Sequence, residues 1–149
     1  MSVMDRESAM ADGLELRDQT LAYVVLRLVL GMNLMMHGVG RLLMGAGEFA
    51  EKLVTQFAHS PLPTWSVWSF GLALPGVEGL LGVLLLVGLR TRATLIAAGT
   101  LMLVLTFGSG LLQDWQAAGT QLIYAAIISG LIALQRFDGW SVDALLARD

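Results

Sequence analysis

Four long apolar stretches, separated by short polar segments, dominate the pattern of this chain. They cover about residues 21–43, 65–89, 93–112 and 117–134. Each is close to the roughly 20 residues that an α-helix needs to cross about 30 Å of hydrocarbon. None alternates like the wall of a barrel, and an isolated apolar strand would leave its backbone unpaired in lipid. The pattern predicts an all-α integral membrane protein with a single domain, residues 1–149, folded as a four-transmembrane-helix antiparallel bundle.

The connections between these stretches are unequal in length. Two are tight turns, near residues 88–92 and 113–116, so the helices that flank each turn must pack antiparallel. The first connection, residues 44–64, is longer. In a helix, its apolar residues at four-residue spacing would lie on the face opposite its charged residues. The apolar set is Phe49, Leu53 and Phe57, and the charged set is Glu48, Glu51 and Lys52. This predicts a short amphipathic helix on the membrane surface, acting either as a functional lid or as a connector that rests on headgroups.

Positive charge is distributed unevenly between the two sides of the predicted bundle. With four spans, the polar N-terminal segment (1–20) and the C-terminal tail (135–149) share one side. Apart from the intramembrane Arg27, that side holds Arg6, Arg17, Arg90, Arg92, Arg136 and Arg148, whereas the other holds Arg41 and Lys52. This bias predicts a multi-pass membrane protein with both termini in the cytoplasm. Arg41, Trp65 and Trp68 then fall at the outer headgroup boundary, where interfacial side chains are common.

Composition supports a membrane protein and excludes several function classes. Hydrophobic residues make up 56% of the chain and charged residues 14%, well below the roughly 25% charged residues of a soluble domain. The chain has no cysteine, which excludes thiol redox chemistry, iron–sulfur clusters and cysteine-ligated zinc within this subunit. No basic patch is present, so nucleic acid is not an expected partner. The expected partners are the lipid bilayer and other membrane protein subunits.

Ionisable residues inside a span are costly, and each needs a partner or a purpose. Arg27, Asn33, His37 and Arg41 fall within one third of the first helix at 100° per residue, so this face is predicted to look into the bundle. Glu78 lies close to the middle of the second span, about 7 Å in depth from Arg27. We therefore predict an Arg27–Glu78 ion pair. The alternative is that Arg27 extends to the inner surface while Glu78 is protonated and hydrogen-bonded.

A second polar group is predicted on the outer side of the membrane midplane. His37 on the first helix reaches a depth similar to that of Gln121 and Tyr124 on the fourth, and Asn33 on the first helix is a further candidate. Such side chains beside apolar walls would suit a quinone headgroup, whose two carbonyls each need a hydrogen-bond donor. The alternative for His37 is a structural histidine bonded to a backbone carbonyl. Haem and metal are disfavoured because the spans offer too few ligands, and no residue is assigned as catalytic.

Five short motifs follow one another along the chain. They are LRLVLG at residues 26–31, HGVGRL at 37–42, LP at 62–63, VEGLLG at 77–82 and LVGLRTR at 86–92. In this order they resemble the DoxX family of small bacterial membrane proteins. The resemblance implies a four-helix inner-membrane protein related to the DoxD subunit of a thiosulfate:quinone oxidoreductase. It also implies that Arg27, His37, Arg41 and Glu78 occupy the family's polar positions.

Two functions follow from these observations. The first is an accessory subunit that packs with, or serves, a quinone-linked redox or energy-converting membrane complex. The second is a quinone-reducing subunit of an oxidoreductase of the thiosulfate:quinone type. Because the chain carries no complete redox centre, the accessory role is the primary prediction and quinone is the candidate ligand.

Overall fold

The computed structural model describes residues 3–147, with side chains described from residue 13 onward, and this part of the chain is helical without strands. The four long helices are α1 (Val3–Met44), α3 (Thr64–Val87), α4 (Thr91–Leu111) and α5 (Trp115–Ala133). Each is long and apolar enough to cross a membrane. The predicted all-α bundle with four spanning helices is confirmed, and the ends of the last three spans lie within about two residues of their predicted positions.

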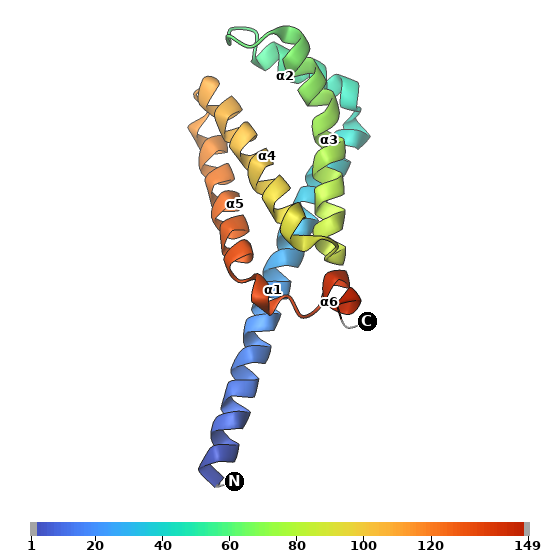
Figure 1. The fold of residues 1–149 in the computed structure, drawn as a ribbon. Coiled ribbons are helices and arrows are strands. Elements are labelled where there is room, and N and C mark those ends of the chain that lie inside the picture. Colours follow the sequence, from blue (N-terminus) through green and yellow to red (C-terminus); the bar gives the residue numbers. More distant parts are fainter. Residues whose placement is uncertain (1–2, 148–149) are drawn as a thin grey trace.

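The start of α1 differs from the prediction. The helix begins at Val3 and continues without a break through the segment expected to be a separate polar region. No proline interrupts residues 3–44, and Gly13, the single glycine of residues 3–20, is too weak a breaker to end a helix with good formers on both sides. At 1.5 Å per residue the helix is about 63 Å long. Its N-terminal part therefore projects beyond the other helices (Figure 1).

Three short helical elements complete the fold: α2 (Ala46–Gln56), the 3-10 turn η1 (Gln135–Phe137) and α6 (Val142–Leu146). The amphipathic helix predicted in the first long connection is thus confirmed as α2. Its buried residue Ala50 packs directly on Gly71 of α3, where an added Cβ would come within 2.9 Å of the Ala50 backbone. The apolar side of α2 consequently faces the protein, and this helix packs on α3 and α1.

Glycines set the contact between α1 and α3. A Cβ added to Gly38 would come within 2.6 Å of the Pro75 carbonyl oxygen, and one added to Gly31 within 3.0 Å of the Gly82 carbonyl oxygen. Only glycine allows two membrane helices to approach so closely. These contacts fix the register of the two helices, with Gly38 beside Gly79.

The long helices form two pairs. Helix α1 packs mainly on α3, and α4 packs mainly on α5. The pairs lie together at the end that carries α6 and diverge toward the end that carries α2 (Figure 1). We call these the α6 end and the α2 end. The shared core between the pairs includes Leu34, Leu85, Leu95, Ile128 and Leu131, all buried.

Candidate functional site

The predicted polar face of α1 divides into a buried stripe and an exposed flank. Arg27 is 1% exposed, whereas His37 is exposed and Asn33 is half-buried. The buried stripe follows the glycines that touch α3. Because Gly38 faces α3, its neighbour His37 is rotated by about 100° away from that helix. A shared third of the helix circumference was therefore not enough to predict that all four polar side chains are buried.

The predicted Arg27–Glu78 ion pair is wrong. Arg27 donates hydrogen bonds to the carbonyl oxygens of Leu85 and Trp140, each at 2.7 Å, and its Nε lies 3.8 Å from Oδ1 of Asp138. The physical reason is the register of α1 on α3. With Gly38 beside Gly79, Arg27 lies eleven residues, or about 17 Å, from the level of Gly79, and Glu78 lies one residue further away. Arg27 instead reaches the α6 end, where the C-terminal segment folds back to meet it.

Asp143 makes the second polar connection of this C-terminal segment. Its carboxylate accepts from the backbone N–H groups of Arg90 at 2.7 Å and Thr91 at 2.6 Å, and its own N–H donates to the Gly88 carbonyl oxygen at 3.0 Å. These donors belong to the start of α4, whose helix dipole favours a negative group. Burial alone would raise the pKa of Asp143, but the backbone hydrogen bonds outweigh it and the pKa is lowered. We call the contacts of Arg27, Asp138, Trp140 and Asp143 the clasp.

The partner of Glu78 is Arg41. Glu78 is 3% exposed, and its Oε2 accepts from Nη1 of Arg41, which lies three residues, or about 4.5 Å, beyond Gly38 on the same stripe of α1. The Arg41 guanidinium also lies 4.8 Å from the centre of the Phe49 ring, a cation–π distance. Arg41 was expected at the headgroup boundary, and it proves to join α1, α2 and α3 at the α2 end.

A cavity of about 490 Å³ opens beside this ion pair, where the two helix pairs diverge. Its apolar walls come from α2, α3 and α4, with Phe49, Leu53, Phe57, Phe70, Leu74, Val104, Leu105 and Phe107 among them. Its polar groups include Arg41, Ser109 and Gln121. Nε2 of Gln121 donates to Oγ of Ser109 at 2.9 Å, while Oε1 of Gln121 is buried and has no hydrogen-bond partner among the described residues.

Of the four residues proposed for a quinone headgroup, only Gln121 lines this cavity. Tyr124 is half-buried and packs against the core between the helix pairs. Oδ1 of Asn33 is buried without a hydrogen-bond partner among the described residues. His37 faces outward, so the four side chains do not converge on one pocket. Ser109 and the aromatic wall from α2 were not predicted as parts of a site, although the four-residue spacing of Phe49, Leu53 and Phe57 indicates that these three side chains share one face.

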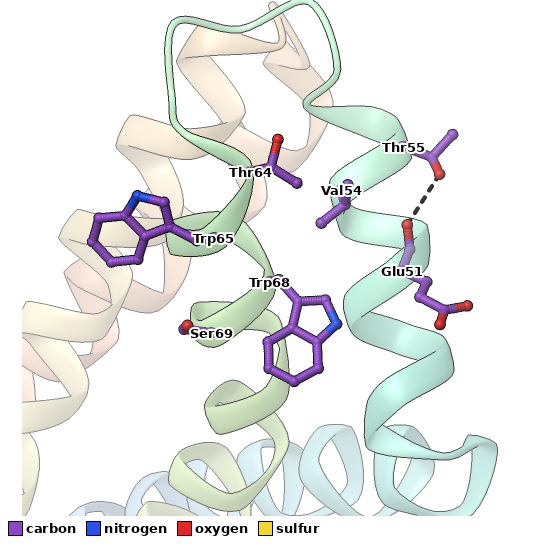
Figure 2. A pocket seen from close by; sticks show the side chains of 7 residues that line it. All are labelled: Glu51, Val54, Thr55, Thr64, Trp65, Trp68 and Ser69. Carbon is purple, nitrogen blue, oxygen red and sulfur yellow. Dashed lines mark hydrogen bonds between the residues drawn. The ribbon is translucent and has the colours of Figure 1, made fainter.

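The two tryptophans predicted at the membrane boundary lie on the first turns of α3. Trp65 is 73% exposed and Trp68 is 43% exposed. They border a separate groove between α2 and α3 (Figure 2), whose lining shares no residue with that of the cavity. Both side chains therefore keep indole surface that the protein does not cover.

Comparison with known proteins assigns the family. A family model described as methylamine utilisation protein MauE matches residues 19–122, which is more than two thirds of the chain and runs from within α1 to the first half of α5. The chain therefore belongs to the MauE family. No curated protein and no solved structure matches it.

The resemblance to DoxX is overturned by this match, because MauE is a different family of membrane proteins. The motifs that suggested DoxX consist largely of glycines at helix contacts and single charged residues within spans. Gly31, Gly38, Gly79 and Gly82 serve the close packing of α1 on α3, and such contacts recur wherever small membrane helices pack tightly. What remains is a multi-pass membrane protein of the MauE family.

Proposed function

We propose that this MauE family member is an accessory membrane subunit of an oxidative system, with methylamine utilisation as the case that the family's description suggests, and that its cavity accepts a quinone headgroup. The cavity is the observation that carries the proposal. Its volume of about 490 Å³ lies within the range of roughly 300–1,000 Å³ that is common for small-molecule sites. It also combines apolar walls with a few polar groups, as such sites do.

The polar groups of the cavity match both redox states of a quinone. The Ser109 hydroxyl accepts from Gln121, so its own proton is free to be donated to a quinone carbonyl. Arg41 carries N–H groups beyond the one that it donates to Glu78. The unpartnered Oε1 of Gln121 supplies an acceptor for the hydroxyl of a quinol. The rings of Phe49 and Phe57 offer surfaces on which a flat ring can stack.

The Arg41–Glu78 pair supports a neutral ligand. The opposite charges of the two side chains offset each other beside the cavity, so a neutral ring can enter without leaving either charge unpaired. Because the chain contains no cysteine, any thiol chemistry in the system has to come from a partner protein. We therefore assign this chain the task of holding the ligand, and we assign electron transfer to a partner.

A thermal-unfolding experiment tests this proposal. The detergent-solubilised protein should unfold at a higher temperature in the presence of a short-chain ubiquinone, because a ligand that binds only the folded state stabilises it. Replacing Gln121 by Leu should reduce this protection. His37→Leu is the matched control, because His37 is a polar residue of the spans that lies outside the cavity. Absence of protection in the wild-type protein, or loss of protection in His37→Leu with retention in Gln121→Leu, would overturn the proposal.

A further inference from the structure

The groove between α2 and the first turns of α3 has a composition of its own. It has a volume of about 860 Å³ and is lined by Glu51, Val54 and Thr55 of α2 and by Thr64, Trp65, Trp68 and Ser69 of α3. None of these residues lines the cavity that we assign to a quinone. The inference that follows is independent of that proposed function.

Indole surface is the first feature of the groove. Figure 2 shows the Trp68 indole turned toward α2 and the Trp65 indole turned away from it. Both rings keep substantial exposed area. Anchoring at a membrane boundary accounts for their position, yet it leaves the ring face of Trp68 free on the side of the groove. Indole is the aromatic side chain that attracts cations most strongly.

Charge is the second feature. Glu51 is the one charged residue among the seven that line the groove, and it is exposed. Within the described part of the chain no cationic side chain pairs with it, because the neighbouring Lys52 is held by Glu48 at 2.9 Å. Its side chain accepts no hydrogen bond there either, since Thr55 donates to the Glu51 backbone carbonyl at 3.0 Å. The groove therefore carries an uncompensated negative charge beside an exposed indole.

We propose that this groove binds an alkylammonium group, with the positive charge shared between the Glu51 carboxylate and the Trp68 indole. Carboxylate and indole together are the combination that recognises organic ammonium ions, since one supplies charge and the other an apolar, electron-rich face. The hydroxyl groups of Thr64 and Ser69 at the same groove can accept hydrogen bonds from an N–H donor.

Two sources can supply this chemistry at a membrane surface. One is the headgroup of a choline or ethanolamine lipid, and the other is a free alkylamine in the surrounding water. The groove lies at the start of an apolar span, the level at which lipid headgroups reside. Its volume of about 860 Å³ leaves room for the rest of a headgroup beside the ammonium.

Ligand-observed NMR with tetramethylammonium chloride tests the proposal on the whole chain in dodecyl maltoside, a detergent that has no ammonium group. We expect saturable transfer of magnetisation to the N-methyl protons. Glu51→Gln should weaken the apparent affinity by about tenfold, and Trp68→Leu by a similar factor.

Two matched controls separate the groove from general surface effects. Glu48→Gln makes the same charge change on the same helix, at a carboxylate already paired with Lys52. Trp140→Leu removes another exposed indole, near the α6 end. Both controls should bind as the wild type does. The proposal is overturned if binding is not saturable, or if each control weakens it as much as the corresponding groove variant.

Nanodiscs distinguish the two sources. In phosphatidylglycerol nanodiscs, which lack ammonium groups, tetramethylammonium should bind as in detergent. If phosphatidylcholine abolishes that binding, the lipid headgroup occupies the groove, and if binding persists in both lipids, the groove takes a free cation. Binding in phosphatidylcholine that is absent from phosphatidylglycerol would contradict the proposal.

Discussion

The two ends of the helical bundle use the same residue type in different ways. At the α6 end, Arg27 is 1% exposed and its guanidinium contacts two backbone carbonyl oxygens and Asp138. At the α2 end, the Arg41 side chain is 25% exposed, pairs with Glu78 and lines a cavity. Both arginines lie on the stripe of α1 that faces α3. The difference lies in what the rest of the chain brings to them.

This comparison separates a structural arginine from one that is available to a ligand. A charged group within a membrane span has to be satisfied by protein, and at the α6 end the folded-back C-terminal segment supplies those partners. At the α2 end the partner is a single carboxylate, and the helix pairs diverge beside it. The clasp therefore holds the pairs together at one end, and the cavity occupies the other.

The largest expected effect comes from breaking the clasp. Arg27→Met removes the cation next to Asp138 and the donors to the Leu85 and Trp140 carbonyl oxygens. Loss of one partner from a buried charged contact costs about 3–5 kcal/mol. We expect the free energy of unfolding in detergent to fall by that amount, measured by denaturant titration. A fall no larger than that of an exposed substitution such as Arg92→Met would show that the clasp does not stabilise the fold.

Arg41 and Glu78, the ion pair at the α2 end, should be energetically coupled, whereas Arg27 and Glu78 should not be. Glu78→Gln leaves Arg41 without its carboxylate and should lower the free energy of unfolding, by less than the roughly 3–5 kcal/mol of a fully buried pair because the Arg41 side chain is 25% exposed. Combining Arg41→Leu with Glu78→Leu should recover much of that loss, because both charges are then removed together. In a double-mutant cycle, Arg27 and Glu78 should instead be additive within about 0.5 kcal/mol. Strong coupling between Arg27 and Glu78 would show that these two residues do form an ion pair, contrary to the register of α1 on α3.

The contact of Asp143 with the start of α4 should depend on pH. The pKa of this carboxyl is lower in the folded protein than its value of 3.8 in the unfolded chain. The contribution of the ionised carboxylate to the free energy of unfolding is therefore complete above pH 3.8, and it is lost as the pH falls below that value. Below about pH 3.8 we therefore expect lower hydrogen-exchange protection factors at the amides of Arg90 and Thr91, where each rate is taken relative to that of an unprotected amide at the same pH. Asp143→Asn should show the lower protection factors already at pH 7, with little further change in them on acidification. An equal pH response in both proteins would assign the effect to other groups.

The prediction with the smallest expected effect on the fold concerns the orientation of the bundle in the membrane. It changes single exposed alanines, so the fold should be unaffected. The excess of arginine on the side of the termini predicts that Ala147→Cys faces the cytoplasm and Ala58→Cys the periplasm. An impermeant maleimide applied to intact spheroplasts should label Ala58→Cys alone, and it should label both after the membrane is opened. The chain has no native cysteine to interfere. The reverse labelling pattern would show that the bundle has the opposite orientation in the membrane.

The spans and α2 were predictable because each depends on residues close together in the sequence. An apolar run of about 20 residues predicts a membrane helix, and the spacing of Phe49 and Leu53 against Glu48 and Lys52 predicted the amphipathic helix that forms between α1 and α3. The continuation of α1 to Val3 was missed because polar composition was treated as a boundary, although no residue there ends a helix.

The polar contacts were harder to predict because they depend on how segments distant in sequence are aligned. Glu78 pairs with Arg41 because the glycines of α1 and α3 fix how the two helices are aligned along their axes. A depth counted from the middle of each span cannot predict that alignment. Asp138 and Asp143 meet α1 and α4 only because the chain turns back after α5. Hydropathy carries no information on such a turn. The cavity likewise follows from the divergence of the helix pairs, which no local pattern encodes.

Photoaffinity labelling in native membranes tests the central claim, that the α2 end holds the ligand site while the α6 end is structural. An azido-quinone would be bound, activated by light and located by mass spectrometry of the digested protein. We predict attachment at residues of the cavity wall such as Phe49, Phe57 or Phe107, with competition by excess unlabelled quinone. Competed attachment at His37 or beside Arg27, or no competed attachment to the chain, would contradict the account.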